Sequence, residues 1–254
     1  MTRYAAGVEY SGTNFHGWEV QQPDVRTVQG EVEKALSKVA DHFVRVTTAG
    51  RTDAGVHAAG QIIHFDSDSE RSERGWVHGA NANLERDLCI AWIKPVSDDF
   101  HARFSALSRS YRYIIFNRPV RTAISADERT WVYRPLDEEM MQQGANHLMG
   151  EHDFSSYRAV ACQAHSPVRT IHSLNVTRHG EEVWIEVRAN AFLHHMVRNI
   201  AGVLISIGSG LNEPQWAKEV LDLRDRTQGG ITAPPEGLSL VSVEYPDHFD
   251  IPSV

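Results

Sequence analysis

A polar loop at residues 49–58 holds the side chains best suited to chemistry. Asp53 follows Arg51 by two residues and stands beside small residues, so a large ligand could reach its carboxylate. A nearby arginine favours the ionised carboxylate, which is the form that a nucleophile needs. Gly50 and Gly55 permit a positive φ or the close approach of a ligand. In the alternative interpretation, Asp53 only hydrogen-bonds the backbone amides of a turn, as aspartates in such loops commonly do.

Regular elements on both sides of the loop are expected to hold it in place. Residues 3–10 predict a strand that ends at a Ser11–Gly12 turn. Thr27 is the predicted N-cap of the next helix. The apolar face of that helix recurs at three- and four-residue spacing and consists of Val28, Val32, Leu36, Val39 and Phe43. Strands at 44–49, 61–65 and 89–96 and a weaker helix at 74–84 complete a β-α-β-β-α-β order.

The second half repeats this plan. It predicts strands at 109–116, 168–178, 182–190 and 238–245 and helices at 136–149, 192–207 and 214–223. The fold class is therefore α+β with two similar domains, 1–104 and 105–254, and a boundary near Phe104. In each domain an antiparallel sheet would carry helices on one face and leave the other face free. An active-site cleft is expected between the two domains.

The charges are unevenly distributed along the chain. A net charge of −8, from 25 basic and 33 acidic residues among 254, argues against a protein that coats nucleic acid indiscriminately. Residues 101–121 nevertheless hold five arginines and no acid, and residues 154–178 hold three arginines and no acid. Phe104, Tyr111, Tyr113 and Phe116 lie in the first window. Arginines that hold phosphates beside aromatic rings that stack on bases favour an RNA surface, with a solvated strand edge as the alternative.

Other patterns exclude several classes of protein. No apolar run approaches the ~20 residues of a membrane span, and residues 1–4 lack a signal-peptide pattern. Cys89 and Cys162 form neither a disulfide framework nor a metal site, which predicts a cytoplasmic protein. The adjacent His194 and His195 diverge around a helix without a third ligand, so we expect no metal. His57 is interpreted as a hydrogen-bonding loop residue, and Tyr113 and Phe116 as core.

Six motifs in one order resemble those of the TruA-type tRNA pseudouridine synthases, over nearly the whole chain. The loop motif is Gly50-Arg51-Thr52-Asp53-Ala54-Gly55-Val56-His57-Ala58. The others are found at residues 10–18, 27–30, 100–106 with Arg109, Tyr111 and Tyr113, 152–159 with 166–171, and 192–202. Ser11 and Glu19 depart from the family pattern, which usually has Asp and Gln there. No binding role is therefore assigned to Glu19.

The resemblance implies an isomerase that converts uridine to pseudouridine at positions 38, 39 and 40 of the tRNA anticodon stem-loop, without cofactor or metal. Asp53 matches the catalytic aspartate, Arg198 an arginine that pairs with it, and Tyr111 a tyrosine that stacks on the flipped uracil. Arg51 is expected to fill the space left by that base or to contact phosphate. Further phosphate contacts are expected from Arg103, Arg109, Arg158 and Arg169. The family is homodimeric, so a homodimer that binds tRNA is expected.

The residues also allow two other functions. A noncatalytic RNA-binding protein of the same fold would bind tRNA and leave uridine unchanged, and the set of Asp53, Tyr111 and Arg198 argues against it. A small-molecule hydrolase could use Asp53 and His57, but it would not need the two arginine windows. Neither the residues nor the resemblance decides whether Asp53 attacks C1′, attacks C6 or abstracts a proton on the way to a glycal.

Overall fold

The computed structural model describes residues 1–22, 24–160 and 162–252, which fall into two compact units. Unit 1 comprises Met1–Arg109 together with Ser239–Val254, and unit 2 comprises Ser110–Leu238. This division differs from the predicted one, which gave the last strand to the second domain. Ser239 and Leu240 pair in parallel with His57 and Ala58 of unit 1, and this pairing brings the end of the chain back to the first unit.

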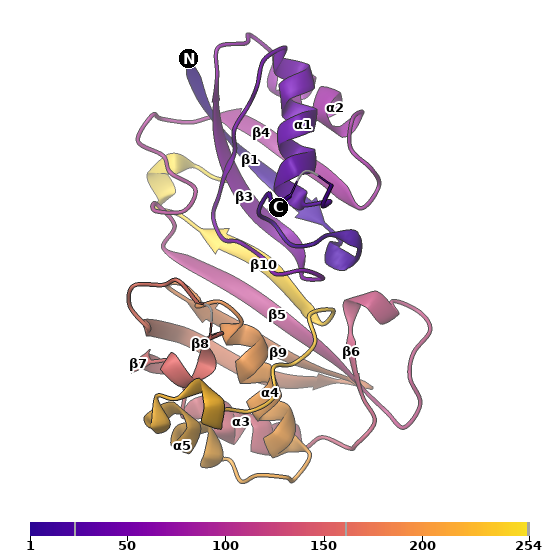
Figure 1. Cartoon of the computed structure of the whole chain (residues 1–254), viewed down its shortest axis with the longest axis vertical. Coiled ribbons are helices and arrows are strands. Elements are labelled where there is room, and N and C mark those ends of the chain that lie inside the picture. Colours follow the sequence, from indigo (N-terminus) through magenta and orange to yellow (C-terminus); the bar gives the residue numbers. More distant parts are fainter. Residues whose placement is uncertain (23, 161, 253–254) are drawn as a thin grey trace. The chain divides into compact units, whose positions relative to one another are not determined.

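Unit 1 is a mixed sheet with two helices. Its elements are β1 (Thr2–Tyr10), α1 (Val28–Ala40), β2 (Thr47–Thr48), β3 (His57–Ser67), α2 (Glu73–Asn81), β4 (Leu88–Pro95) and β10 (Leu238–Glu244). The strand order is β4-β1-β3-β10, and β2 pairs with β3. Figure 1 shows α1 and α2 side by side next to these strands. The predicted α+β class is thereby confirmed for this half.

Helix α1 begins as predicted and ends earlier than predicted. The Thr27 hydroxyl accepts a hydrogen bond from the Gly30 amide, which confirms it as the N-cap. Asp41 adopts a left-handed conformation with φ of 60° and ends the helix. Phe43 therefore lies beyond the helix and is 72% exposed, so its assignment to the apolar face was wrong.

The predicted strand at 44–49 is reduced to Thr47–Thr48. The amide of Val44 donates to the Ser37 hydroxyl and that of Val46 to the Glu33 carboxylate, both on α1. These backbone donors are used by the helix and cannot join a strand ladder. The segment that leads into the Asp53 loop is thus anchored to α1 at residues 44–46 and joins β3 of the sheet only at residues 47–49.

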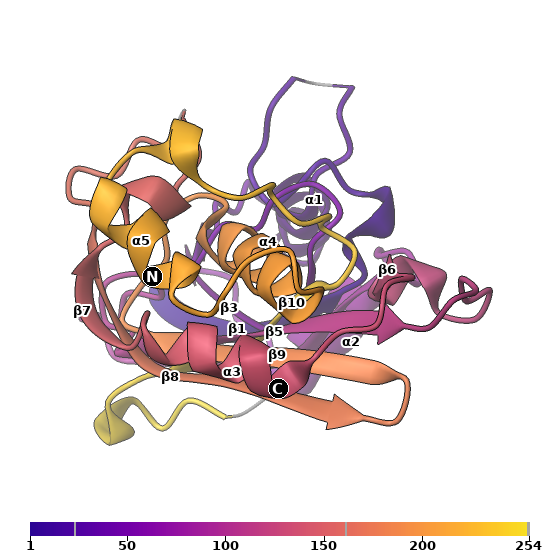
Figure 2. The ribbon, with the colours of Figure 1, turned by 90° about the horizontal axis from the view of Figure 1, so that it is seen from below.

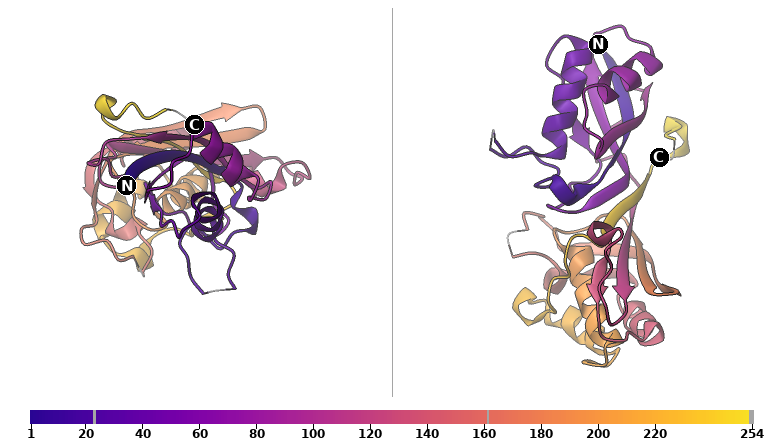
Figure 3. Two further views of the ribbon diagram at one scale, coloured as in Figure 1. Left: turned by 90° about the horizontal axis from the view of Figure 1, so that it is seen from above. Right: turned by 90° about the vertical axis from the view of Figure 1, so that its right-hand side faces the viewer.

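Both faces of the unit 1 sheet are covered. Trp76 of α2 is fully buried and packs against Tyr4 and Phe65 on one face. On the opposite face, Ala5 and Ile62 belong to a cluster whose other members are Ala49, Phe100, Ala102, Tyr245 and Phe249. The expectation of a free face is therefore wrong for this part of unit 1, because residues 100–102 and the C-terminal segment pack there. In the left view of Figure 3, α1 is seen nearly end-on beside the strands of this unit.

His64 on this second face gives unit 1 a pH-dependent stability. Burial lowers the pKa of His64 to about 4, and the nearby His101 and Arg3 act in the same direction. Its Nδ1 accepts a hydrogen bond from the Ala102 amide, which requires the neutral ring. The unfolded chain binds this proton near the ordinary pKa of about 6.5, so a fall in pH from 6.5 to 4 favours unfolding.

We expect His64→Gln to flatten this pH response. In wild-type protein the free energy of unfolding should fall by about 1–2 kcal/mol between pH 6.5 and pH 4 because of this proton. The variant should be less stable at pH 7.5, but its free energy of unfolding should change less between pH 6.5 and pH 4. Urea denaturation at several pH values measures both, and parallel slopes for the two proteins would rule out His64 as the source.

Unit 2 holds the remaining elements. They are β5 (Ser108–Asn117), which starts at the end of unit 1, β6 (Thr130–Val132), α3 (Glu138–Asn146), β7 (Gly150–Asp153), β8 (Val168–His179), β9 (Glu182–Ala189), α4 (Met196–Gly208) and α5 (Trp216–Leu223). The strand order is β5-β9-β8-β7, and β6 pairs in parallel with β5. The short strands β6 and β7 were not predicted. Gly180, with φ of 63°, forms the predicted turn between β8 and β9.

The two faces of the β8–β9 hairpin have opposite character. Leu174 pairs with Val187 and Val176 with Ile185, and these four side chains are buried on one face. Figure 2 shows α4 and α5 on one side of the hairpin. The neighbouring pair Asn175 and Glu186 points to the other face, which is polar. Tyr113 and Phe116 of β5 are buried, which confirms their prediction as core.

The described residues bear on two sequence predictions, which concern a disulfide and a membrane-spanning helix. Cys89 and Cys162 are both free thiols, in agreement with the prediction that they form no disulfide. No helix in the described part of the chain combines the length and the hydropathy that a membrane span requires.

Candidate active site

Backbone hydrogen bonds fix the Asp53 loop on both sides. The Trp18 amide donates to the Thr52 carbonyl at 3.0 Å, and the Gly55 amide donates to the Phe15 carbonyl at 3.3 Å. Within the loop, the Val56 amide donates to the Asp53 carbonyl at 3.2 Å. Gly55 has φ of 79°, as the sequence suggested for this position. The segment that follows β1 therefore holds the loop over its whole width.

Two glycines allow this segment to approach the loop. A Cβ atom at Gly12 would lie 2.1 Å from the Val56 carbonyl oxygen, and one at Gly17 would lie 2.9 Å from the Thr52 carbonyl oxygen. Gly17 also has φ of 90°, which side-chain-bearing residues rarely adopt. Backbone meets backbone at both places, so a larger residue there would displace the loop.

A buried hydrogen-bond network joins the loop to side chains of β1 and β3. The Tyr10 hydroxyl lies 2.8 Å from the Thr52 hydroxyl and accepts a bond from the Gln61 amide. Gln61 also donates to the Gly50 carbonyl at 2.7 Å. Burial raises the pKa of Tyr10 to about 12, so the hydroxyl keeps its proton at physiological pH. This network was not predicted from the sequence, although polar residues within apolar strands are a signal for such a support.

The loop presents Asp53 between a buried and an exposed neighbour. Thr52 is buried, Asp53 is half-buried and Ala54 is exposed. The rigid backbone and the partial exposure together give a carboxylate that is positioned and still open to a ligand. His57 is buried, and its Nδ1 accepts a hydrogen bond from the Gly12 amide at 3.0 Å. This bond confirms His57 as a hydrogen-bonding residue of the loop end.

Arg51 forms an ion pair with Glu19. The guanidinium lies 2.6 Å from the Glu19 carboxylate, and both side chains are more than half exposed. Glu19 follows Trp18, whose carbonyl accepts a bond from the Gln29 amide of α1. The segment that braces the loop thus also supplies a carboxylate to the arginine two residues before Asp53.

Arg109 has a structural part that was not predicted from the sequence. It is 8% exposed, and its guanidinium donates to the carbonyls of Arg103, Ala49 and Ala106 at 2.6, 3.0 and 3.3 Å. A buried guanidinium that is occupied by carbonyls is badly placed for a phosphate, which argues against the predicted phosphate contact. Arg109 instead connects the 103–106 turn to the start of the Asp53 loop.

We expect Arg109→Lys to destabilise unit 1, because an ammonium cannot reproduce the forked contacts. The free energy of unfolding should fall by about 2 kcal/mol, the usual scale for hydrogen bonds from a charged group. Arg45→Lys is the matched control, since the Arg45 side chain is 67% exposed in its pair with Glu33. Chemical denaturation measures both variants, and equal stability of the two would contradict the bracing role.

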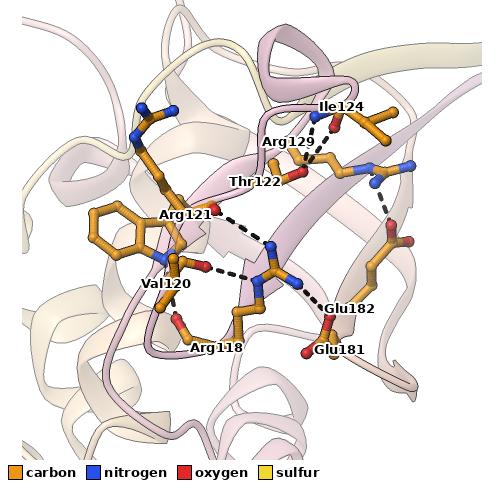
Figure 4. A network of polar contacts seen from close by, with 9 residues as sticks. Arg118, Val120, Arg121, Thr122, Ile124, Arg129, Glu181 and Glu182 are labelled. Atoms are coloured by element: carbon orange, nitrogen blue, oxygen red, sulfur yellow. Dashed lines mark hydrogen bonds and ion pairs between the residues drawn. The ribbon is translucent and has the colours of Figure 1, made fainter.

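Ion pairs neutralise much of the first arginine window. Arg112 forms an ion pair with Glu186 at 2.8 Å and lies over the Trp184 ring at 4.2 Å. Arg118 pairs with Glu181, as Figure 4 shows, and donates to the carbonyls of Val120 and Arg121. The acids come from β9 and its turn, far away in sequence. The window of five arginines therefore does not act as a patch of five available charges.

The second window is reduced in the same way. Arg178 pairs with Glu138 at 2.8 Å, so one of its three arginines is engaged. Arg169 is half-buried and donates to the carbonyls of Ser166 and Val168, and burial lowers its pKa. Arg158 is half-buried, and its charge acts on Asp153. Arg103 is exposed in the turn that Arg109 braces.

Tyr111 and Arg198 both lie in unit 2. Tyr111, on β5, is buried and meets the Phe192 ring edge-on at a centroid distance of 5.0 Å. Arg198 lies in the first turn of α4, where its Nε donates to the Ala233 carbonyl at 2.8 Å. Helix α4 starts at Met196 rather than at 192, because His195 adopts a left-handed conformation with φ of 63°. Both side chains are thus held by their own unit.

Comparison with known proteins identifies the family. A family model described as tRNA pseudouridine synthase matches residues 6–105 and 145–246. A protein of Alcanivorax borkumensis named tRNA pseudouridine synthase A is 56% identical over 252 residues, which cover 99% of this chain and 94% of the relative. The proteins of that name from Coxiella burnetii and Nitrosococcus oceani are 57% and 58% identical, and the matches cover 99% and 98% of this chain and 96% of each relative.

The family-model match includes the Asp53 loop, its bracing segment and most of unit 2. The identity extends over almost the full length of each chain compared. The chain belongs to the tRNA pseudouridine synthase family, a family of isomerases.

Proposed function

We propose that this enzyme isomerises uridine to pseudouridine at positions 38, 39 and 40 in the anticodon stem-loop of tRNA, with Asp53 as the nucleophile. The observation that carries the proposal is the braced loop, in which a half-buried Asp53 is held by backbone bonds from residues 15–18. Family membership supplies the reaction class and the tRNA substrate. Asp53 is the only carboxylate that this loop contains.

The proposed reaction uses a positioned carboxylate. The N1–C1′ bond of uridine breaks, the uracil turns, the C5–C1′ bond forms, and the proton at C5 is transferred to N1 or exchanged with solvent. Substrate and product have the same composition, so the enzyme needs no co-reactant. Holding the carboxylate in place reduces the entropic cost of reaching the transition state. The hydrogen bonds from the Tyr10 network and the 15–18 segment supply that rigidity.

Further residues are proposed to take part in catalysis and in tRNA binding. We propose that Arg198 pairs with Asp53 and keeps it ionised, and that Tyr111 stacks on the target uracil. Arg51 fills the space of the flipped base or contacts phosphate, while Arg103, Arg158 and Arg169 contact the tRNA backbone. Arg109 is left out because its guanidinium is buried. The enzyme acts as a homodimer in the cytoplasm, and light scattering of the purified chain tests the dimer.

Transcripts with a single uridine test the proposed target region. Each tRNA transcript carries uridine at only one of positions 38, 39 and 40 within the anticodon stem-loop, and pseudouridine is mapped by position after reaction. Product at each of the three positions supports the proposal. Product confined to another arm of the tRNA would contradict the assignment of the anticodon stem-loop while leaving the reaction class intact.

Glu19 provides a test of the role of Arg51. We expect Glu19→Gln to lower the Kd for tRNA about two- to fivefold at 0.1 M salt, the scale of one exposed ion pair. The reason is that Arg51 no longer has to exchange a carboxylate for a phosphate. Glu85→Gln is the matched control, because Glu85 also pairs with an arginine, Arg26, on the surface of unit 1. An equal gain in both variants would indicate a general charge effect and contradict the specific role.

A further inference from the structure

Four aromatic rings form a column from the core of unit 1 to its surface. Phe100 is fully buried and meets His64 edge-on, with ring centroids 6.2 Å apart. The ring centroids of His64 and His101 are 4.7 Å apart. Those of His101 and Phe104 are 4.4 Å apart, with an angle of 33° between the ring planes. The last ring, Phe104, is 76% exposed. We call these four residues the ring column.

The backbone locks the exposed end of the column in place. His101 Nδ1 accepts hydrogen bonds from the amides of both Arg103 and Phe104, each at 3.2 Å. The Ser105 amide donates to the His101 carbonyl, and Arg109 donates to the Arg103 carbonyl. These hydrogen bonds hold the backbone of the turn in a conformation that places the Phe104 side chain at the surface. Exposure of Phe104 is therefore a fixed property of the turn.

The chemistry around Phe104 fits a nucleobase. Burial lowers the pKa of His101, and its Nδ1 is an acceptor, so the rings beneath Phe104 are neutral at physiological pH. The Arg103 guanidinium lies 5.5 Å from the Phe104 ring centre, and residues 100–107 contain no acid. An exposed aromatic face beside an arginine is suited to a stacked base and its phosphate.

The column also lies close to the Asp53 loop within the same unit. Ala49, directly before the loop, belongs to the same buried cluster as Phe100 and Ala102. Arg109 bridges the carbonyls of Ala49 and Arg103, so one guanidinium ties the loop to the turn that presents Phe104. A base held on Phe104 would belong to a nucleotide of the same RNA that reaches Asp53.

We propose that Phe104 is a stacking platform for an unpaired base of the RNA substrate, with Arg103 at the adjoining phosphate. This inference rests on the proposed function for the identity of the RNA. It assigns the ring column a role in substrate binding, separate from the uracil that undergoes the reaction. The base stacked on Phe104 adds a fifth ring to the column.

Phe104→Ala tests the platform against a closely matched control. Phe43 is the same residue type in the same unit, 72% exposed and outside the column, so Phe43→Ala removes an equivalent surface ring. We expect Phe104→Ala to raise the Kd for tRNA about five- to a hundredfold, the range for one base–aromatic stack. Phe104→Tyr should remain within about threefold of wild type, and Phe43→Ala within about twofold.

A fluorescent variant detects the stacking directly. The additional emission of Phe104→Trp over wild type should be quenched when tRNA binds, whereas the additional emission of Phe43→Trp should not change. Equal tRNA binding by Phe104→Ala and Phe43→Ala would overturn the proposal. A change in oligomeric state confined to Phe104→Ala would also overturn it, in favour of a self-association surface.

The same preparations separate this inference from the proposed function. In one outcome, wild-type enzyme forms pseudouridine, but Phe104→Ala and Phe43→Ala bind tRNA equally well. This outcome refutes only the stacking platform. Wild-type enzyme that binds tRNA through Phe104 and forms no pseudouridine refutes the proposed function and supports the platform.

Discussion

Replacing Asp53 by asparagine should reduce the rate of pseudouridine formation by about 10³-fold or more, the scale for losing a catalytic nucleophile. The amide has nearly the same shape, so the bonds that hold the loop backbone should survive, including those from Trp18 and Gly55. The Kd for tRNA should change less than about threefold, since one half-buried side chain is altered. Single-turnover reactions followed by nucleoside chromatography measure the rate, and anisotropy measures the binding.

Asp68→Asn is the control for this experiment. Asp68 is an exposed aspartate of unit 1 that pairs with His42, away from the loop, and its loss should leave the rate unchanged. Turnover by Asp53→Asn at the rate of Asp68→Asn would show that the Asp53 carboxylate is not the nucleophile. It would then favour the turn-forming role that aspartates in such loops commonly have.

Gly12→Ala should have the second-largest effect. Its new Cβ atom would lie 2.1 Å from the Val56 carbonyl oxygen, which no real contact allows, so backbone must move. The same residue donates its amide to His57 Nδ1, and displacement would break that bond at the end of the loop. A misplacement of about 1 Å costs about 10²-fold in rate. We expect a loss of that size in kcat/KM and a loss of about 2–4 kcal/mol in unfolding free energy.

Gly180→Ala distinguishes this crowding from the general cost of replacing glycine. Gly180 has φ of 63° and open space around it, so the variant carries only the strain of the left-handed conformation, about 1–2 kcal/mol. Its kcat/KM should stay within about twofold of wild type. A Gly12→Ala enzyme as active as Gly180→Ala would show that the contact between Gly12 and Val56 does not position the loop.

The elements of the fold were predicted well where local signals decide them. Thr27 caps a helix that starts at the next residue, and Gly180 forms the turn between two strands that flank it. Both roles depend only on neighbouring residues, and both were identified from sequence. The errors occurred where distant groups decide. Phe43 has the right spacing for α1, but the helix ends at Asp41. The amide of Val46 bonds to Glu33, thirteen residues earlier, instead of a strand.

The assignment of β10 failed for the same reason. Its pattern predicts a strand, but pairing with β3 of unit 1 is decided by residues about 180 positions earlier in the chain. The order of the longer helices and strands in each half could be predicted, whereas the short strands β6 and β7 and the partner of the last strand could not. Hydrophobic spacing specifies which face is buried but does not specify the neighbouring strand.

The candidate site shows the same division. The polar, glycine-bounded loop around Asp53 could be found from sequence, and so could the role of His57. The use of the arginines could not, because ion pairs form across strands. The sequence places five arginines and no acid at residues 101–121. In the structure, Glu186 and Glu181 form ion pairs with two of these arginines, and Arg109 is buried. The acids responsible lie about 60–75 residues further along the chain.

Tritium release from tRNA that is labelled at C5 of its uridines tests the central claim most directly. Joining C5 to C1′ must expel the hydrogen at C5, so the release of tritium into water counts each isomerisation. Wild-type enzyme should release tritium in equal amount to the pseudouridine formed, and Asp53→Asn should release none above background in the same time. Tight tRNA binding by wild type with no tritium released would contradict the account.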